Sequence, residues 1–224
     1  MNTGAASDPR EEVLGRIRSA LRDVPLADAA AIAASWRAID RSYIRSGSLG
    51  RNEVLELLED RLHDYDANVV RAKEGEVSSA IAHLLATRGL RKLVVPQGLE
   101  EVLGEALPEG FTFVVDHALS SQDLDAFDGI ITASTCAIAE TGTIVLQYVP
   151  GQGRRAPTLI PDYHLCIVRA TDVVETVPEA TAILEVTSAL ATTFFSGPSA
   201  TADIEMTRIK GVHGPRFLDV ILVP

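Results

Sequence analysis

The fold is decided by residues 67–116, which read ANVVRAKEGEVSSAIAHLLATRGLRKLVVPQGLEEVLGEALPEGFTFVVD. Three β-branched runs in it alternate with two helical patterns, the first of which ends at Gly89. Strands that alternate with helices of about 9 to 13 residues are typical of βαβ units. The stretch therefore predicts an α/β protein with a mostly parallel open sheet and helices on both faces.

The middle of the chain breaks this alternation. Three β-like runs follow one another with no helix between them, G-I-I-T-A-S-T-C-A-I-A, I-V-L-Q-Y-V and T-L-I-P-D-Y-H-L-C-I-V. They predict a meander or β-hairpins added to the sheet. A helix over residues 178–190, a buried strand A-T-T-F-F and a last strand F-L-D-V-I-L-V complete the expected elements.

The first 49 residues differ from the rest. E-E-V-L-G-R-I-R-S-A-L-R has the apolar spacing of an amphipathic helix. Residues 24–48 lack a sustained period, although their Ala-rich middle has a helical composition, which favours a mobile or partner-dependent segment. A sustained helical pattern begins at Arg51. We therefore expect an N-terminal helix and flexible segment over residues 1–49 and an α/β domain over 50–224.

Composition excludes several classes of function. The chain has 20 basic and 31 acidic residues among 224, a net charge of −11, which argues against a nucleic-acid surface or adhesion to anionic membranes. No apolar stretch approaches the roughly 18 residues of a membrane span, and the N-terminus has no signal-peptide core. We expect a cytoplasmic protein with no membrane span and no nucleic-acid partner.

The two cysteines, Cys136 and Cys166, form no C-x-x-C pair. The chain alone therefore has no ligand set for an iron–sulfur cluster or a usual structural zinc site, so we expect no metal and no cofactor in it. Both lie in apolar runs, where a buried thiol is a better interpretation than a reactive nucleophile. No G-x-G-x-x-G follows a strand, so a dinucleotide site is unsupported.

A tract near the C-terminus, S-G-P-S-A-T-A-D-I-E (196–205), has the features of a strand-to-helix turn. Gly197 and the next proline break the periodicity, and A-D-I-E-M-T-R-I reads as a short helix that Ser199 or Thr201 could cap. Unpaired N–H groups at such a helix start suit a phosphate or carboxylate. The alternative is a structural turn in which Asp203 satisfies those groups itself.

A second tract, A-I-A-E-T-G-T-I-V-L (137–146), places Glu140 as the only charge in a long apolar stretch. Gly142 permits the positive φ of a tight turn. Glu140 is either a solvent-exposed hairpin tip or a carboxylate in a cleft, tuned by desolvation as an acid, base or nucleophile.

A third tract, G-V-H-G-P-R (211–216), surrounds His213 with two glycines and a proline before the last strand. A histidine beside Arg216 could serve an anionic ligand, and a turn with a surface histidine is the alternative. His164 is expected at the core or its edge, and Arg154 and Arg155 as a solvated basic patch. We expect the three tracts to meet at one end of the sheet, outside the carboxyl ends of the strands.

Together, and in this order and spacing, the three tracts resemble the lactate-utilisation (LUD) domain family, most closely its lactate-utilisation protein C (LutC/YkgG) branch. The resemblance covers about residues 50–224. It implies a fold similar to the NagB/RpiA/CoA-transferase-like α/β group, which includes 5-formyltetrahydrofolate cyclo-ligase. It also implies work beside two partner proteins in oxidising L-lactate to pyruvate, with the iron–sulfur clusters in the partners.

The resemblance also implies the site residues. Glu140 is the catalytic hypothesis, because CoA-transferase relatives use a glutamate on a comparable turn as nucleophile. The ligand-binding set is Thr141, Gly142, Thr143, Ser196, Gly197, Ser199, Thr201, Asp203, His213, Gly214 and Arg216.

Two functions of different classes follow. The first is a non-redox subunit of a lactate-oxidising system that binds a small anion or its iron–sulfur partner proteins. The second is a stand-alone CoA-transferase-like or cyclo-ligase-like enzyme acting on an acyl or phosphorylated substrate, which requires Glu140 and the Ser196 loop in one cleft near Arg216. A plain scaffold would leave the loops far apart. Whether the chain is itself catalytic stays open.

Overall fold

The computed structural model describes residues 8–22, 28–202, 208–211 and 213–224, and the chain separates into two compact units, residues 1–43 and 44–224. The first unit contains two helices, α1 (Pro9–Ala20) and α2 (Ala29–Ala38). Asp8 and Asp28 cap their N-termini by accepting from backbone N–H groups two residues on. Neither helix has a buried residue, so the two helices form no hydrophobic core.

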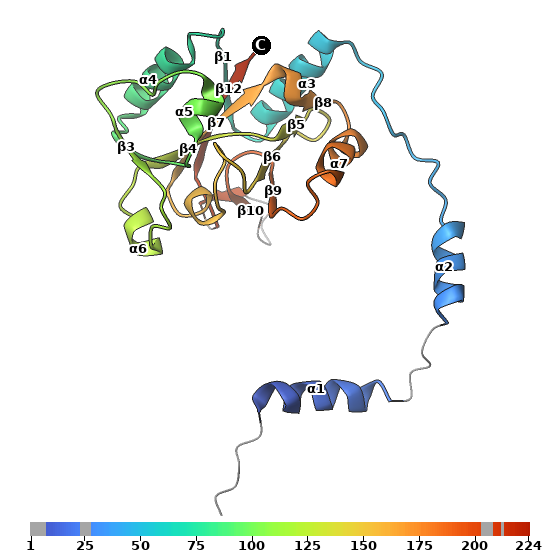
Figure 1. Ribbon diagram of the computed structural model, residues 1–224. Coiled ribbons are helices and arrows are strands. Elements are labelled where there is room, and N and C mark those ends of the chain that lie inside the picture. Colours follow the sequence, from blue (N-terminus) through green and yellow to red (C-terminus); the bar gives the residue numbers. More distant parts are fainter. Residues whose placement is uncertain (1–7, 23–27, 203–207, 212) are drawn as a thin grey trace, which may run out of the picture. The chain divides into compact units, whose positions relative to one another are not determined.

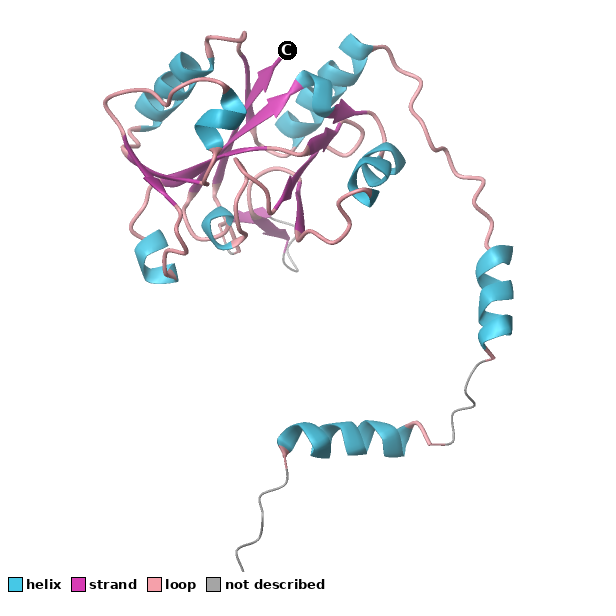
Figure 2. Ribbon diagram, in the orientation of Figure 1, coloured by secondary structure: helices cyan, strands magenta, loops and turns pink. Residues whose placement is uncertain are grey.

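The second unit is built on a six-stranded sheet in which every pairing is parallel (Figures 1 and 2). The strand order is β1-β12-β7-β4-β2-β3. The strands are β1 (Asn68–Arg71), β2 (Lys92–Val95), β3 (Thr112–Val115), β4 (Gly129–Ala133), β7 (Tyr163–Arg169) and β12 (Phe217–Val223). The α/β class and the parallel sheet predicted from residues 67–116 are confirmed.

The run over residues 129–139 divides between two sheets. Its first half is β4, and its second half, β5 (Cys136–Ile138), joins a separate four-stranded sheet of order β8-β5-β6-β9. The other strands are β6 (Thr143–Gln147), β8 (Val173–Val174) and β9 (Thr192–Phe195). The expected hairpin is β5–β6, but it forms a second sheet instead of extending the first. β9 is an edge strand and only half-buried, with Phe194 55% exposed, so the expectation of a buried strand is wrong.

Helices and the second sheet cover the two faces of the central sheet. One face packs against α4 (Val77–Arg88) and α5 (Leu99–Leu103). The other face packs against α3 (Arg51–Asp64) and the second sheet, and near β2 against α6 (Ser121–Leu124). The outer face of the second sheet is covered by α7 (Val177–Glu185), which is shorter than predicted (Figure 1). Alternate residues of β7 therefore serve two cores.

The predicted helix over residues 202–209 is wrong at both of its described ends. Residues Ala200–Ala202 form strand β10, which pairs antiparallel with β11 (Arg208–Lys210), and 203–207 lie outside the described residues. Pairing with residues six to ten positions away along the chain has replaced the local helix at these ends. With no helix starting there, the argument for an anion site at a helix N-terminus is lost.

Candidate functional site

The loops of the first and third tracts meet at the amino-terminal edge of the central sheet. Residues 211–216 lead directly into β12, and residues 196–199 follow β9. Residues of both loops line one cavity with His164 and Leu218, the second residues of β7 and β12. The expected position at the carboxyl ends is therefore wrong, because the 211–216 loop precedes its strand and must lie where that strand begins.

Hydroxyl groups join the Glu140 turn to the Ser196 loop. Thr141 Oγ1 and Thr143 Oγ1 lie 2.7 Å apart, and Thr143 Oγ1 lies 2.7 Å from Ser196 Oγ. Gly142 occupies the left-handed region (φ 58°) against α3, where a Cβ would come within 2.8 Å of Arg61. The turn therefore holds Ser196 in place through Thr143, but the residues of the turn do not themselves line the cavity.

Ser199 joins the Ser196 loop to the His213 loop. Its backbone N–H donates to Pro215 O (2.8 Å), and its carbonyl accepts from Gly211 N–H (2.9 Å). Its Oγ accepts from the backbone N–H of His213 (3.2 Å). Gly214 packs against the same side chain, where a Cβ would be 3.3 Å from Ser199 Cβ. Three of the predicted ligand-binding residues are thereby held together.

The cavity between these loops has a volume of about 270 Å³. Its polar side chains are four hydroxyls, two imidazoles and one guanidinium, those of Thr158, Thr193, Ser196, Ser199, His164, His213 and Arg155. Arg155 is exposed and donates from Nη1 to Thr193 Oγ1 (3.0 Å). No carboxylate belongs to the described residues that line the cavity. In a chain of net charge −11, such a lining suits a small anion.

The two adjacent arginines of the expected basic patch differ in role. Arg154 binds Asp116 through Nε (2.6 Å) and Nη2 (2.9 Å), and it also donates to Leu119 O. Burial opposes ionisation of Asp116, but the Arg154 guanidinium holds the pKa of that carboxyl below its ordinary value. Sequence reasoning missed Arg155 as a cavity residue, because a polar Gly-flanked loop gives no sign of which arginine is paired.

His164 forms the floor of the cavity. It is 3% exposed, its Nε2 lies 2.8 Å from Thr132 Oγ1, and its ring lies 5.1 Å from that of Phe195. Burial lowers the pKa of this imidazole to about 4, so it is neutral at physiological pH. The prediction that His164 lies at the edge of the core is confirmed.

Besides Thr141, Gly142 and Thr143, four predicted residues lie outside the cavity lining or are only partly described. Glu140 is exposed and does not line the cavity, and its backbone N–H donates to Glu175 O (3.0 Å). Arg216 forms an ion pair with Asp162 through two nitrogens. Thr201 belongs to β10 by its backbone, and Asp203 lies outside the described residues.

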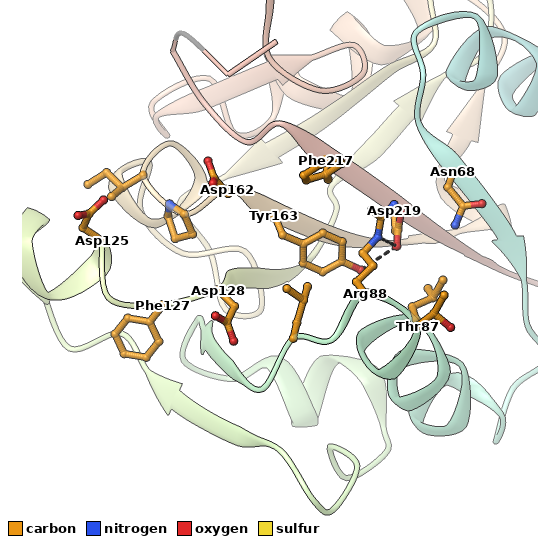
Figure 3. Close-up of a pocket in the computed structure, with 14 residues that line it drawn as sticks. Asn68, Thr87, Arg88, Asp125, Phe127, Asp128, Asp162, Tyr163, Phe217 and Asp219 are labelled. Atoms are coloured by element: carbon orange, nitrogen blue, oxygen red, sulfur yellow. Dashed lines mark hydrogen bonds and ion pairs between the residues drawn. The ribbon is translucent and has the colours of Figure 1, made fainter.

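A larger cavity of about 870 Å³ also opens at the amino-terminal edge, lined in part by Arg88, Tyr163 and Asp219 (Figure 3). Asp219 is fully buried and accepts from Arg88 Nε (2.8 Å) and Nη2 (2.5 Å) and from the Tyr163 hydroxyl (2.9 Å). Figure 3 shows these side chains directed at one another. Arg88 is therefore neutralised by its own protein, which makes this cavity a poorer anion site than the first.

The remaining chemistry of the described residues is limited. Cys136 and Cys166 are buried free thiols, as predicted, and burial raises their pKa values to about 11 and about 12. No group of three or more His, Cys, Asp or Glu side chains that could hold a metal ion occurs in the described part of the chain. None of the described helices combines the length and the apolar character that crossing a bilayer requires.

The LUD domain model matches residues 55–223. A lactate utilization protein C from Deinococcus radiodurans is 42% identical over 178 residues, which span 78% of this chain and 82% of that protein. The chain belongs to the LUD domain family. A lactate utilization protein C from Bacillus pumilus is 28% identical to this LUD protein and spans 92% of both chains. The resemblance to the protein C branch is thus confirmed.

A solved structure supports the LUD fold directly. The crystal structure of a DUF162 family protein from Deinococcus radiodurans superposes with a TM-score of 0.67 at 36% identity, covering 79% of this LUD protein and all of that chain. Every residue of the smaller cavity lies inside the LUD match, whereas helices α1 and α2 lie before it.

Proposed function

We propose that this chain is a non-redox subunit of an L-lactate-oxidising system and that it binds a small anion in the cavity beneath Ser196 and Ser199. The place in lactate utilisation is supported by the names of its relatives. The anion site rests on one observation above all: the Arg155 guanidinium stands at a cavity whose other described polar groups are hydroxyls and imidazoles. A carboxylate of lactate's size fits about 270 Å³.

We assign electron transfer to iron–sulfur partner proteins, because this chain offers only two cysteines. A cluster needs about four ligands, usually thiolates. Both thiols are buried and resist deprotonation, so neither is ready to bind metal. The chain would therefore supply binding and positioning within the assembly, and its partners the redox centres.

A stand-alone CoA-transferase-like or cyclo-ligase-like enzyme has less support. That function needs a carboxylate nucleophile in the cleft, and Glu140 is exposed and outside the cavity lining. It also needs a nearby cation such as Arg216, whose guanidinium is paired with Asp162. The nucleophile hypothesis for Glu140 stays a prediction.

The test is lactate oxidation in a system reconstituted from this chain and the proteins encoded beside it, after checking that they co-purify. We expect oxidation to require the chain and to fall about tenfold or more with Arg155→Gln, because a charge-assisted contact to the anion is lost. Arg91→Gln, at an exposed arginine outside the cavity, should leave the rate unchanged. Equal rates with and without the chain would refute the proposal, and abolition by Glu140→Gln would favour the second function.

A further inference from the structure

A second cavity lies beside the one beneath Ser196 and Ser199. Its volume is about 230 Å³, and both cavities are lined by Arg155, Thr158 and Thr193. These three residues therefore form a wall between the two spaces. Arg155 is exposed, its Nη1 donates to Thr193 Oγ1, and its other N–H donors have no partner among the described residues. Its guanidinium can thus be reached from either cavity, and a ligand can extend past it from one to the other.

Gln152 directs an unpaired amide group into this second space, the Gln152 cavity. The residue is only 6% exposed, and its Oε1 accepts from the backbone N–H of Gln147 (2.7 Å) and from Thr135 Oγ1 (2.8 Å). A backbone N–H can only donate, so the atom facing it is the amide oxygen, which fixes the position of Nε2. Nε2 has no hydrogen bond to a described residue, and no sealed side-chain nitrogen or oxygen of the described residues lacks a partner. Its N–H donors must therefore be open to the cavity that Gln152 lines.

The neighbouring polar groups of the Gln152 cavity are used within the protein. Gln147 Nε2 donates to Thr192 Oγ1 (3.2 Å), and the Arg154 guanidinium is neutralised by its ion pair with Asp116. No carboxylate belongs to the described residues that line this cavity. The buried donor that it offers is thus the uncharged amide of Gln152, which suits an acceptor oxygen.

We propose that the Gln152 cavity is a second subsite, which takes an uncharged carbonyl group of a ligand whose carboxylate contacts Arg155 from the first cavity. This rests on the proposed anion site and makes Gln152 a residue that determines specificity. One guanidinium balances one carboxylate, so a second negative charge beside Gln152 would lose its hydration with no free cation to offset the loss. The ligand class is therefore a monocarboxylate that carries an amide or ester carbonyl further along its chain.

The experiment compares three probes of one length, succinamate, butyrate and γ-aminobutyrate, by titration into the full chain with NMR detection. They share the carboxylate and end in a carbonyl amide, a methyl group and an ammonium group. Glutaramate, valerate and δ-aminovalerate repeat the comparison with one more carbon. The wild-type chain should bind the amide of at least one series about tenfold more tightly than the plain carboxylate, because only the amide pairs with the buried N–H donors of Gln152.

Gln152→Glu keeps the oxygen that accepts from Gln147 and Thr135 and replaces the N–H donors with a second oxygen. It should reverse the preference, so that the amino acid of that series binds more tightly than the amide. Gln152→Met, which has a similar length and no N–H donor, should bind the amide and the plain carboxylate equally. Gln122→Glu, at an exposed glutamine on α6 outside both cavities, adds the same charge and should leave the wild-type order unchanged.

The outcomes separate this inference from the proposed function. Equal wild-type affinities for the amide and the plain carboxylate in both series would overturn the second subsite and leave the anion site standing. A preference for the amide that survives in Gln152→Glu or Gln152→Met, in a variant shown to be folded by its amide spectrum, would also overturn it. If no probe binds to the wild-type chain, the anion site and this inference both fail.

Discussion

The neutral imidazole of His164 links the stability of this protein to pH. Its pKa is about 4 in the folded chain against an ordinary value of 6.5, because burial disfavours the charged form. Between pH 4 and pH 6.5 the imidazole is therefore protonated in the unfolded chain but not in the folded chain. The contribution of His164 to stability is therefore complete above about pH 6.5 and is lost as the pH falls toward 4.

We expect lowering the pH from 7 to 5 to reduce the free energy of unfolding by about 2 kcal/mol through this residue alone. Urea unfolding at the two pH values measures the change. Carboxylates whose pKa values are also lowered, such as Asp116 and Glu179, lose their contribution only as the pH falls below their ordinary values of 3.8 and 4.5, so they change stability little between pH 7 and 5. The His164→Gln variant keeps these carboxylates but lacks the imidazole. Its free energy of unfolding should therefore fall by about 2 kcal/mol less than that of the wild-type chain between pH 7 and 5. Identical pH dependence in both proteins would contradict a buried neutral His164.

The turn between β9 and β10 carries Ser196 and Ser199, and its position therefore determines where these two side chains lie in the cavity. Gly197 occupies the left-handed region (φ 75°), and a Cβ there would lie 2.8 Å from the backbone oxygen of Tyr65. Gly75 has a similar φ of 82° with nothing within 4 Å. Substitution of Gly75 therefore measures only the cost of a left-handed backbone conformation, whereas substitution of Gly197 adds the cost of a steric clash with Tyr65.

Gly75→Ala should destabilise the fold by about 1 kcal/mol, the ordinary cost of a left-handed alanine. Gly197→Ala should cost at least about 2 kcal/mol, because the turn must also move away from α3, and it should weaken anion binding by displacing Ser196 and Ser199. Thermal melts and lactate titration of both variants provide the measurement. Equal stability losses would show that the close approach to Tyr65 is unimportant.

Local sequence patterns predicted most helices and strands. They failed where the structure of a segment depends on the strand with which it pairs. Residues 67–116 form the expected βαβ units, because each apolar period is completed within its own segment. Residues 129–139 look like one strand, yet their halves pair with β7 and with β6 in different sheets. Residues around 202–209 look helical, but Ala200–Ala202 pairs with Arg208–Lys210. The spacing of apolar residues within a segment does not show which other strand the segment pairs with.

The same limit applies to the candidate site. Ser196, Ser199 and His213 were found, because glycines and prolines mark their loops, whereas Thr158 and Thr193 were not. Arg155 was not found, because its place in the cavity lining depends on Asp116 pairing with the neighbouring arginine. The edge of the sheet was also misjudged, because the 211–216 loop precedes β12 and a loop that precedes a strand of a parallel sheet lies at its amino-terminal edge.

At the scale of the whole molecule, charge is unevenly divided between the two units. Residues 1–43 contain six basic and six acidic residues, so the net charge of −11 belongs to residues 44–224. The helices of the first unit expose apolar side chains, including Ile17, Ile32 and Trp36, and the ordering of residues 24–48 on a partner stays a prediction. An anion approaching the second unit meets a repulsive overall field. Its binding must therefore depend on the local cation, Arg155.

Calorimetric titration of L-lactate into the full chain tests this dependence most directly. We predict one binding site per chain in the wild-type protein, an affinity at least about tenfold weaker in Arg155→Gln, and no change in Arg91→Gln. Unchanged affinity in Arg155→Gln, or the absence of any binding to the wild-type chain, would contradict the assignment of this cavity as the anion site.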